Sequence, residues 1–414
     1  MISKLILDKE WPRRIFHEFR RKIAKVWLKM NPGVEIIGVT GSYGKTNTVW
    51  AIGKVLSERY KTLQTDLNLD TIYNLPITIL KLRPWHKAMV LEYGVDHKNE
   101  MDFHLELVKP KIGVLTGITP VHADSEHFGS LENILNEKTK LLSVIPSNGW
   151  IIINWDDENI RKIKIKTSVK IVKYGTSKKA DFWAEKIKVD LSGTSFFLCD
   201  SQEKIPLKIS LLGRHFVHSA LAAFIIGKIF GLSKKEIISG LKKLRPLKGR
   251  MSLEKGPQEI FILDDHLRAN LASTLAGLRT LSDIPCRRRK IAVLGEMGEM
   301  GKYAKEGHRL IGEEIAKLRI DYLISVGPLQ RETFREAVSK GMRKDSVFWA
   351  KDVKEAAGIL KKILRKEDLL YLKGSLLRHM ERVILILKGE RVDCVVNLCH
   401  FYNPCHLCPN LRKI

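Results

Sequence analysis

The feature that most constrains this chain is a glycine-rich turn between a predicted strand and a predicted helix. An apolar run over 34–39 predicts a buried strand, a helical pattern covers 46–56, and between them lies the turn Gly41-Ser42-Tyr43-Gly44-Lys45-Thr46-Asn47. Glycines there let backbone N–H groups close around phosphate oxygens, the lysine reaches the β- and γ-phosphates, and the threonine hydroxyl can ligate Mg²⁺. The segment therefore predicts a P-loop that binds a nucleoside triphosphate, although Val39 stands where the full pattern has its first glycine.

Length and charge limit the class of protein. The chain has 414 residues, enough for two or three domains, and its 44% hydrophobic and 29% charged residues are typical of globular proteins that fold in water. No apolar run approaches the roughly 20 residues of a membrane span, and the first residues lack a signal-peptide pattern, so we expect a cytoplasmic location. The net charge of +26 suits nucleic acid, an anionic membrane surface or a polyanionic substrate. Nucleic acid is disfavoured, because the chain carries no RNA-binding signature and no helix-turn-helix pattern.

Strand and helix patterns alternate twice along the chain, which predicts an α/β fold. From 33 to 247 we expect a P-loop central ATP-binding domain with a mostly parallel sheet, to which 182–211 adds antiparallel strands. From 248 to 390 we expect a second, Rossmann-like α/β domain, flanked by an N-terminal helix within 1–32 and a cysteine-rich tail over 391–414. The other expected strands cover 34–39, 86–93, 112–118, 149–155, 169–174, 260–263, 290–294, 322–325, 346–350 and 368–373.

The segment 12–30 predicts a basic amphipathic helix. Pro12 suits a first helical position, and Asn31-Pro32-Gly33 ends the pattern. We expect this helix to dock on the following domain, while its basic pattern leaves open a helix that lies on an anionic membrane surface. Its apolar positions are Ile15, Phe16, Phe19, Ile23, Val26, Trp27 and Met30, and its basic positions are Arg13, Arg14, Arg20, Arg21, Lys22, Lys25 and Lys29.

Two polar side chains that follow predicted strands of the central domain are candidate metal ligands. Glu92 lies at the end of the strand over 86–93, and His122 comes soon after the strand over 112–118. Ligands of open α/β sheets bind outside the carboxyl ends of the strands. A carboxylate there, with Thr46, can hold the Mg²⁺ that bridges β- and γ-phosphates, and His122 is a candidate ligand of a second metal.

In this order, the P-loop, Glu92, His122, Phe128-Gly129-Ser130 and a downstream lysine resemble the central domain of the Mur ligases. These are ATP-dependent enzymes of peptidoglycan synthesis, and the pattern is most similar to the members that add D-alanyl-D-alanine. The resemblance implies that Lys138 is carbamylated and becomes an anionic ligand near the second Mg²⁺. A bare ammonium would be repelled by the metal, so the conversion makes physical sense. Without the resemblance, Lys138 is a solvated helix lysine.

The resemblance continues through the second domain, over about residues 33 to 388. The segment 245–251 resembles the family's hinge and implies that Arg250 reaches an ATP phosphate. The segment 264–270 resembles the family's Asp-Asp-x-Tyr-Asn-Ala-Asn stretch, with substitutions at 267 and 268, and implies that Asp265 and Asn270 complete the nucleotide site on domain closure. Further matches lie in order at 212–223, 293–301 and 372–381.

The resemblance implies an ATP-dependent amide-bond ligase that works through an acyl phosphate, with ATP and Mg²⁺, on a nucleotide-sugar peptide. The amine would be D-alanyl-D-alanine and the acceptor a muramoyl-peptide precursor of the cell wall. Because the P-loop begins near residue 38, we expect the family's uridine-binding N-terminal domain to be absent. That expectation keeps open a Mur-type ligase for another carboxylate (folylpolyglutamate-, pseudomurein- or tetrapyrrole-like). A basic binding protein with a vestigial ATPase is opposed by the joint presence of Lys45, Thr46, Glu92, His122 and Lys138.

The tail carries four of the six cysteines, at Cys394, Cys399, Cys405 and Cys408. Tetrahedral zinc takes four thiolate or imidazole ligands, and a Cys-x2-Cys pair is half of such a site. The first pair, with four residues between the cysteines, is wider than usual. Bound zinc and reduced thiols in a partly ordered tail therefore both stay open.

Overall fold

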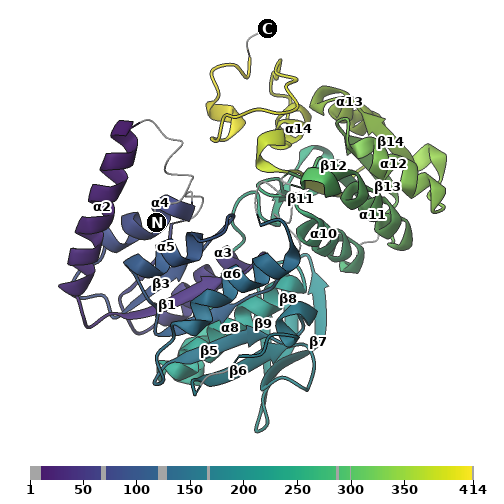
Figure 1. Ribbon diagram of the computed structural model, residues 1–414. Helices are drawn as coiled ribbons and strands as arrows, with labels where there is room; N and C mark the ends of the chain where they lie inside the picture. Colours follow the sequence, from purple (N-terminus) through teal and green to yellow (C-terminus); the bar gives the residue numbers. More distant parts are fainter. Residues whose placement is uncertain are drawn as a thin grey trace. The chain divides into compact units, whose positions relative to one another are not determined.

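The computed structural model describes residues 11–66, 71–119, 128–165, 168–285, 289–298 and 300–412. The chain divides into two compact units (Figure 1). The first contains Met1–Ile187, Ser195–Ile209 and His215–Leu244, and the second contains Lys188–Thr194, Ser210–Arg214 and Arg245–Ile414. In the part of the chain that the structure describes, no helix is both long and apolar enough to cross a bilayer.

The larger sheet has nine strands within the described residues, in the order β2-β3-β1-β4-β5-β6-β7-β8-β9. From β2 to β7 every neighbouring pair is parallel, as the alternating pattern predicted. The last three strands are joined by connections of a few residues, which only antiparallel neighbours allow. The bounds are β1 (Glu35–Thr40), β2 (Thr62–Gln64), β3 (Ala88–Glu92), β4 (Ile112–Leu115), β5 (Trp150–Asn154), β6 (Lys170–Gly175), β7 (Phe182–Asp190), β8 (Gly193–Cys199) and β9 (Lys204–Ile209).

Helices cover both faces of the parallel part of this sheet, so the strands β1, β3, β4 and β5 are largely buried on both sides. Met89 and Leu91 of β3 join an apolar core with α4, α5 and α6, whereas α3, α8 and α9 pack against one another as a second group. Ser130 caps α6 by accepting a hydrogen bond from the backbone N–H of Asn133, which fixes where that helix begins. The bounds are α3 (Lys45–Leu56), α4 (Thr71–Leu80), α5 (Glu100–Leu107), α6 (Leu131–Ser143), α7 (Glu158–Arg161), α8 (His215–Ile229) and α9 (Lys234–Lys242).

The N-terminal helix α2 (Trp11–Lys29) packs on α4 in the first unit (Figure 1). Ala24 is fully buried there, the indole N–H of Trp27 donates to the carbonyl of Leu82 at 3.1 Å, and Arg21 lies over the ring of Phe103. The helix therefore docks, as expected, but most of its predicted apolar positions are not in the contact. Apart from Trp27, the described ones lie on a face that is exposed to solvent.

The second unit contains a sheet of six described strands in the order β10-β11-β15-β12-β13-β14, parallel except for β10. This is the second α/β domain that the sequence predicted. One layer of helices is α10 (Leu271–Asp283), α11 (Ala304–Lys317) and α12 (Gln330–Ser339), and α13 (Val353–Ile363) and α14 (Glu381–Leu387) close a separate apolar core. The strands are β10 (Ser252–Lys255), β11 (Phe261–Asp265), β12 (Lys290–Gly295), β13 (Tyr322–Val326), β14 (Val347–Ala350) and β15 (Leu369–Lys373).

The cysteine-rich tail packs on the second unit rather than forming a sheet or long helix of its own. The guanidinium of Arg382, 1% exposed, donates to the carbonyls of Cys394 and Val396 at 3.2 and 2.7 Å. Val392, Cys405 and Leu411 form a small apolar cluster that packs against Leu385 and Ile386 of α14. Buried hydrogen bonds to an ionised donor are strong, so Arg382 fixes the start of the tail in place.

Candidate active site

The glycine-rich turn has the backbone geometry of a phosphate cradle. Gly41 has φ +148° and Gly44 has φ +78°, values that favour glycine, and a Cβ on Gly41 would lie 2.2 Å from the hydroxyl of Thr116. Gly44 is the N-cap residue of α3, so the first backbone N–H groups of that helix face the turn. Ser42 N–H donates to the carbonyl of Gly117 at 2.7 Å, which ties the turn to the segment after β4. The site fits a phosphate, because a helix N-terminus and close backbone approach coincide here.

The side chain of Tyr43 anchors the turn through a hydrogen bond that the sequence pattern did not predict. Its hydroxyl donates to Asp157 Oδ2 at 2.9 Å, and that oxygen also accepts from the N–H of Ile118 at 2.9 Å. Burial and the neighbouring Asp157 raise the pKa of Tyr43, so the phenol stays protonated and keeps donating. The Tyr43 side chain therefore positions the turn, and phosphate binding by the Tyr43 backbone N–H stays a prediction. The one available signal was that Asp157 follows a strand, β5, at the edge that carries the P-loop.

Lys45 and Thr46 begin α3, and Glu92 ends β3, which is the neighbour of β1 in the sheet. Lys45 Nζ donates to the carbonyl of Gly41 at 2.8 Å, so the side chain folds back over the turn. Within the described residues the Glu92 carboxylate has no hydrogen-bond or ion-pair partner. The strand order is consistent with the prediction that these residues share the carboxyl edge of the sheet. Asn47, the other predicted residue of this turn, lies in the first turn of α3.

Lys138 lies on α6 and is only 2% exposed, which differs from a solvated helix lysine. Its Nζ donates to the carbonyl of Val95 at 3.1 Å, just after β3, and no carboxylate lies within ion-pair distance of it in the described chain. Burial, and next the charge of Lys45, lower the pKa of Lys138 to about 7. A buried amine at this pKa is largely neutral slightly above pH 7, and only a neutral amine attacks carbon dioxide.

Acidic side chains surround Lys138 without pairing with it. Glu100 Oε2 accepts from the N–H groups of Asp96 and His97, and Glu137 accepts from the N–H of Met101 and from Lys140 Nζ. The Glu100 bonds hold the loop after β3 on the start of α5, and the Glu137 bond to Met101 holds α5 against α6. The sequence did not single out this loop, although it follows the strand that ends in Glu92.

Oxygen donors at this edge fit a hard divalent cation. A hydroxyl at Thr46, the Glu92 carboxylate, which has no partner among the described residues, and, after carbamylation, two oxygens on Lys138 are the ligand types that Mg²⁺ prefers. His122, the other predicted ligand, lies outside the described residues, so its placement stays a prediction.

In the second unit, Asp265 ends β11 and is tightly held. Its Oδ2 accepts from Lys373 Nζ at 2.6 Å and from the hydroxyl of Tyr371 at 3.0 Å, and its Oδ1 accepts from the N–H of Met251 at 3.2 Å. Asn270 caps α10 through a hydrogen bond from the N–H of Ser273 at 2.9 Å. Arg250 lies in a short bridge with Leu247 at the start of this unit. Nucleotide binding by Arg250, Asp265 and Asn270 stays a prediction.

The four tail cysteines do not form the predicted zinc site. In the described part of the chain, the only His, Cys, Asp or Glu ligand atoms that gather in a group of three within 4.8 Å are those of His379, Glu381 and Cys405. His379 Nδ1 and Glu381 Oε1 are hydrogen-bonded at 2.9 Å, and Cys405 N–H donates to the same oxygen at 3.2 Å. The spacing of the cysteines alone therefore did not show where the thiols lie, and a four-cysteine zinc site is not supported.

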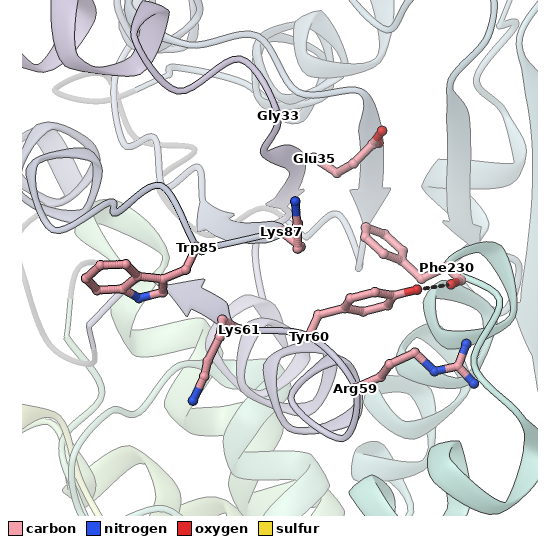
Figure 2. Close-up of a pocket in the computed structure, with 8 residues that line it drawn as sticks. All are labelled: Gly33, Glu35, Arg59, Tyr60, Lys61, Trp85, Lys87 and Phe230. Carbon is pink, nitrogen blue, oxygen red and sulfur yellow. Dashed lines mark hydrogen bonds between the residues drawn. The ribbon is translucent and has the colours of Figure 1, made fainter.

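A cavity of about 490 Å³ lies at the opposite edge of the large sheet (Figure 2). Its lining residues precede strands or follow helices: Gly33, Glu35, Arg59, Tyr60, Lys61, Trp85, Lys87 and Phe230. Arg59 is already paired with Glu236, and the hydroxyl of Tyr60 donates to the carbonyl of Phe230. Because ligands of such sheets bind at the carboxyl ends of the strands, this open hollow is separate from the candidate site.

The fold and the turn geometry are those of a P-loop nucleotide-binding domain followed by a second α/β unit. Residues 39–227 match the Mur ligase middle domain, and residues 249–376 match the family described as "Mur ligase, glutamate ligase domain". The chain belongs to the Mur ligase family.

Curated relatives carry one recurring name. The chain is 29% identical over 325 residues to the UDP-N-acetylmuramoyl-tripeptide–D-alanyl-D-alanine ligase of Escherichia coli, which covers 78% of this chain and 71% of the relative. It is 28% identical over 367 residues to the ligase of the same name from Bacillus subtilis, which covers 88% and 78%.

Solved structures show the same fold. MurF from Acinetobacter baumannii superposes with a TM-score of 0.79 at 24% identity, over 90% of this chain and 81% of that one. The MurF ligase of Thermotoga maritima in complex with ADP gives a TM-score of 0.78 at 21% identity, over 90% and 84%.

Proposed function

We propose that this protein is an ATP-dependent ligase that joins D-alanyl-D-alanine to a UDP-N-acetylmuramoyl-tripeptide. The family membership supports ligase chemistry, and the names of the curated relatives support this pair of substrates. The observation that carries the proposal for this chain is Lys138. Lys138 is buried at the carboxyl edge of the large sheet, where the P-loop and Glu92 also lie. Its pKa is near 7, and it has no carboxylate partner among the described residues.

The environment of Lys138 favours conversion to a carbamate. With a pKa of about 7, half of the amine is neutral at pH 7. A lysine at the ordinary value of about 10.4 would have a neutral fraction of roughly one in a few thousand at that pH. The carbamate also replaces a buried cation with an anion, which removes its repulsion by Lys45. Lys138 would then present anionic oxygens to a cation at the site.

The remaining residues of the edge would hold the triphosphate. Backbone N–H groups around Gly41 to Gly44 would bind phosphate oxygens, and Lys45 would move from the Gly41 carbonyl to the β- and γ-phosphates. Thr46, Glu92 and carbamylated Lys138 would hold Mg²⁺, with His122 as a further predicted ligand. Bound Mg²⁺ supplies charge neutralisation on the transferring phosphoryl group.

The proposed reaction consists of two substitution steps. A carboxylate oxygen of the acceptor attacks the γ-phosphorus of ATP, so the bond to ADP breaks and an acyl phosphate forms. The neutral amine of D-alanyl-D-alanine then attacks the acyl carbon, and inorganic phosphate leaves as the amine loses a proton. Lys45 stabilises the developing charge in the first step, which is where preorganised cations contribute most.

Phosphate release tests the proposal. The full chain should release phosphate from ATP only when both the UDP-N-acetylmuramoyl-tripeptide and D-alanyl-D-alanine are present. Lys45→Ala should abolish this release, whereas Lys54→Ala, an exposed lysine on the same helix, should leave it unchanged. A protein that binds ATP but turns over only another carboxylate, such as a folyl or pseudomurein peptide, would keep the ligase chemistry and overturn the substrate. Folded Lys45→Ala protein with normal turnover would overturn the site.

A further inference from the structure

An apolar stripe on helix α2 faces solvent. Phe16, Phe19, Ile23, Val26 and Met30 are 56%, 60%, 42%, 59% and 67% exposed. They recur at intervals of three and four residues, so they line one side of the helix and its last turn. Five large apolar side chains in one continuous row exceed the single exposed hydrophobics found on ordinary protein surfaces.

The stripe is not a consequence of a loosely held helix. The opposite side of α2 is fixed by buried Ala24, by the Trp27 hydrogen bond to Leu82 and by Arg21, whose guanidinium donates to the carbonyl of Phe103 at 2.8 Å. His17 stacks on the ring of Tyr73, with centroids 3.9 Å apart. That side is held by α4 and α5, whereas the residues of the stripe are exposed. Figure 1 shows α2 at the periphery of the first unit.

Cations border the stripe. Lys22, Lys25 and Lys29 are exposed along one flank, and the guanidinium of Arg20 lies over the ring of Phe16 at 4.6 Å. Glu18 is the one acidic residue in the sequence of α2, against seven lysines and arginines. The surface therefore combines an apolar row with a strongly positive edge.

We propose that this face of α2 docks on an anionic phospholipid surface, so that the ligase is held at a membrane without spanning it. The apolar row would enter the boundary between headgroups and acyl chains, while the long lysine side chains keep their charges among the lipid phosphates. The opposing face, already bound to α4, would carry the rest of the first unit. This binding is independent of the proposed reaction.

Charge argues for lipid over a second copy of the chain. Two stripes packed together would bring the flanking lysines of both helices close to one another, with only Glu18 to compensate, and like charges at such a seam are destabilising. A surface of lipid phosphates gives every one of these cations an opposite charge.

Vesicle sedimentation of the full chain tests the proposal. We expect the protein to pellet with vesicles of mixed phosphatidylcholine and phosphatidylglycerol and to stay in solution with vesicles of phosphatidylcholine alone. Phe16→Ser with Phe19→Ser should lower the partition coefficient at least about tenfold, because two large apolar groups are lost. Lys22→Gln with Lys29→Gln should lower it several-fold per charge and weaken its dependence on salt.

Matched control variants test whether these effects are specific to the exposed face of α2. Leu398→Ser with Leu407→Ser removes equally exposed apolar groups from the tail, and Lys361→Gln with Lys362→Gln removes exposed charges from α13; both should leave vesicle binding unchanged. All of these variants should keep the phosphate release of the parent protein in free solution, so a failed ligase assignment leaves this test intact.

Three outcomes would overturn the proposal. The first is equal binding to neutral and anionic vesicles, or none to either. The second is a dimer in sedimentation equilibrium that Phe16→Ser with Phe19→Ser dissociates, which would assign the stripe to a second copy. The third is a large fall in melting temperature for that variant with vesicle binding retained, which would assign the stripe to another segment of the same chain.

Discussion

Lys138 in the first unit and Lys373 in the second are equally buried, with 2% of each residue exposed, yet their surroundings differ. Lys373 Nζ lies 2.6 Å from Asp265 Oδ2 and also donates to the carbonyl of Arg268 at 2.8 Å. Lys138 has the Val95 carbonyl at 3.1 Å and, among the described residues, no carboxylate within ion-pair distance. Lys373 is a paired charge, whereas Lys138 is an amine whose charged form is disfavoured by burial and by Lys45.

The difference separates a lysine held in an ion pair from the lysine that we propose to be reactive. A buried ammonium is tolerated when an anion and further acceptors satisfy it, as at Lys373. Without such an anion the pKa falls instead, and the neutral amine becomes available for chemistry. Burial alone would not have distinguished the two residues; the position of the nearest carboxylate does.

The largest expected effect is on catalysis. Lys138→Ala should lower kcat about a thousandfold or more, equivalent to about 4 kcal/mol, because it removes an anionic group that would hold the metal. An added short carboxylate such as formate should restore part of the activity. Glu132→Ala, which changes an exposed residue on the same helix, should change kcat less than twofold. Full activity of Lys138→Ala would make the two buried lysines equivalent and end the comparison.

The next effect is on stability. Lys373→Met should lower the free energy of unfolding by about 3 kcal/mol or more, because the largely buried carboxylate of Asp265 would keep its contact with Tyr371 but lose its cation. Lys138→Met should leave stability unchanged or raise it at pH 7, since it removes an unpaired charge. Urea unfolding of both variants checks this, with Lys373→Met, Asp265→Asn as the control that removes both charges and should recover part of the loss. Equal destabilisation by the two single variants would contradict the comparison.

The pH dependence of stability tests the environment of Lys138. The pKa of Lys138 is lowered to about 7 in the folded chain, so between about pH 7 and 10 the unfolded chain binds more protons and stability rises with pH. From pH 7 to 9 the gain should be about 2 kcal/mol, and below pH 7 the cost of burying the charge is fully present. Measured without bicarbonate, Lys138→Met should lack this slope. A parent protein with the same slope as that variant would place the lysine in a solvated environment.

The smallest expected effect is on stability in the tail, where a buried cysteine and a partly exposed one should differ. Cys405→Ser should cost about 1 kcal/mol, because a hydroxyl replaces a thiol in the cluster with Val392 and Leu411, whereas partly exposed Cys399→Ser should change stability by less than about 0.5 kcal/mol. Thermal melting measures both. Loss of an equivalent of bound zinc in each variant would revive the four-cysteine site that the structure does not support.

Local patterns predicted the fold well where one segment determines its own structure. The strand over 34–39, the glycine turn and the helix that follows appear as β1, the cradle and α3. Parallel pairing of β3, β1 and β4 placed Glu92 at the P-loop edge. These predictions rest on neighbours in sequence and on the general rule that active groups follow strand ends.

Contacts between distant segments could not be predicted in this way. Tyr43 and Asp157 meet only because β5 lies two places from β1 in the sheet. The buried face of α2 was not evident either, because apolar residues occur on both sides of the helix and α4 decides which side packs. Lys138 was singled out by family resemblance, but its burial, and the absence of a carboxylate partner among the described residues, depend on how α6 meets the loop after β3.

Oxygen-isotope transfer tests directly whether the protein forms an acyl phosphate on the acceptor carboxylate. The full chain is supplied with ATP, D-alanyl-D-alanine and the UDP-N-acetylmuramoyl-tripeptide labelled with ¹⁸O in its terminal carboxylate, and product and phosphate are analysed by mass spectrometry. We expect the amide product together with one ¹⁸O atom in each inorganic phosphate, because the acceptor carboxylate oxygen leaves with the phosphoryl group. Phosphate without label, or ATP consumed with no amide product, would contradict it.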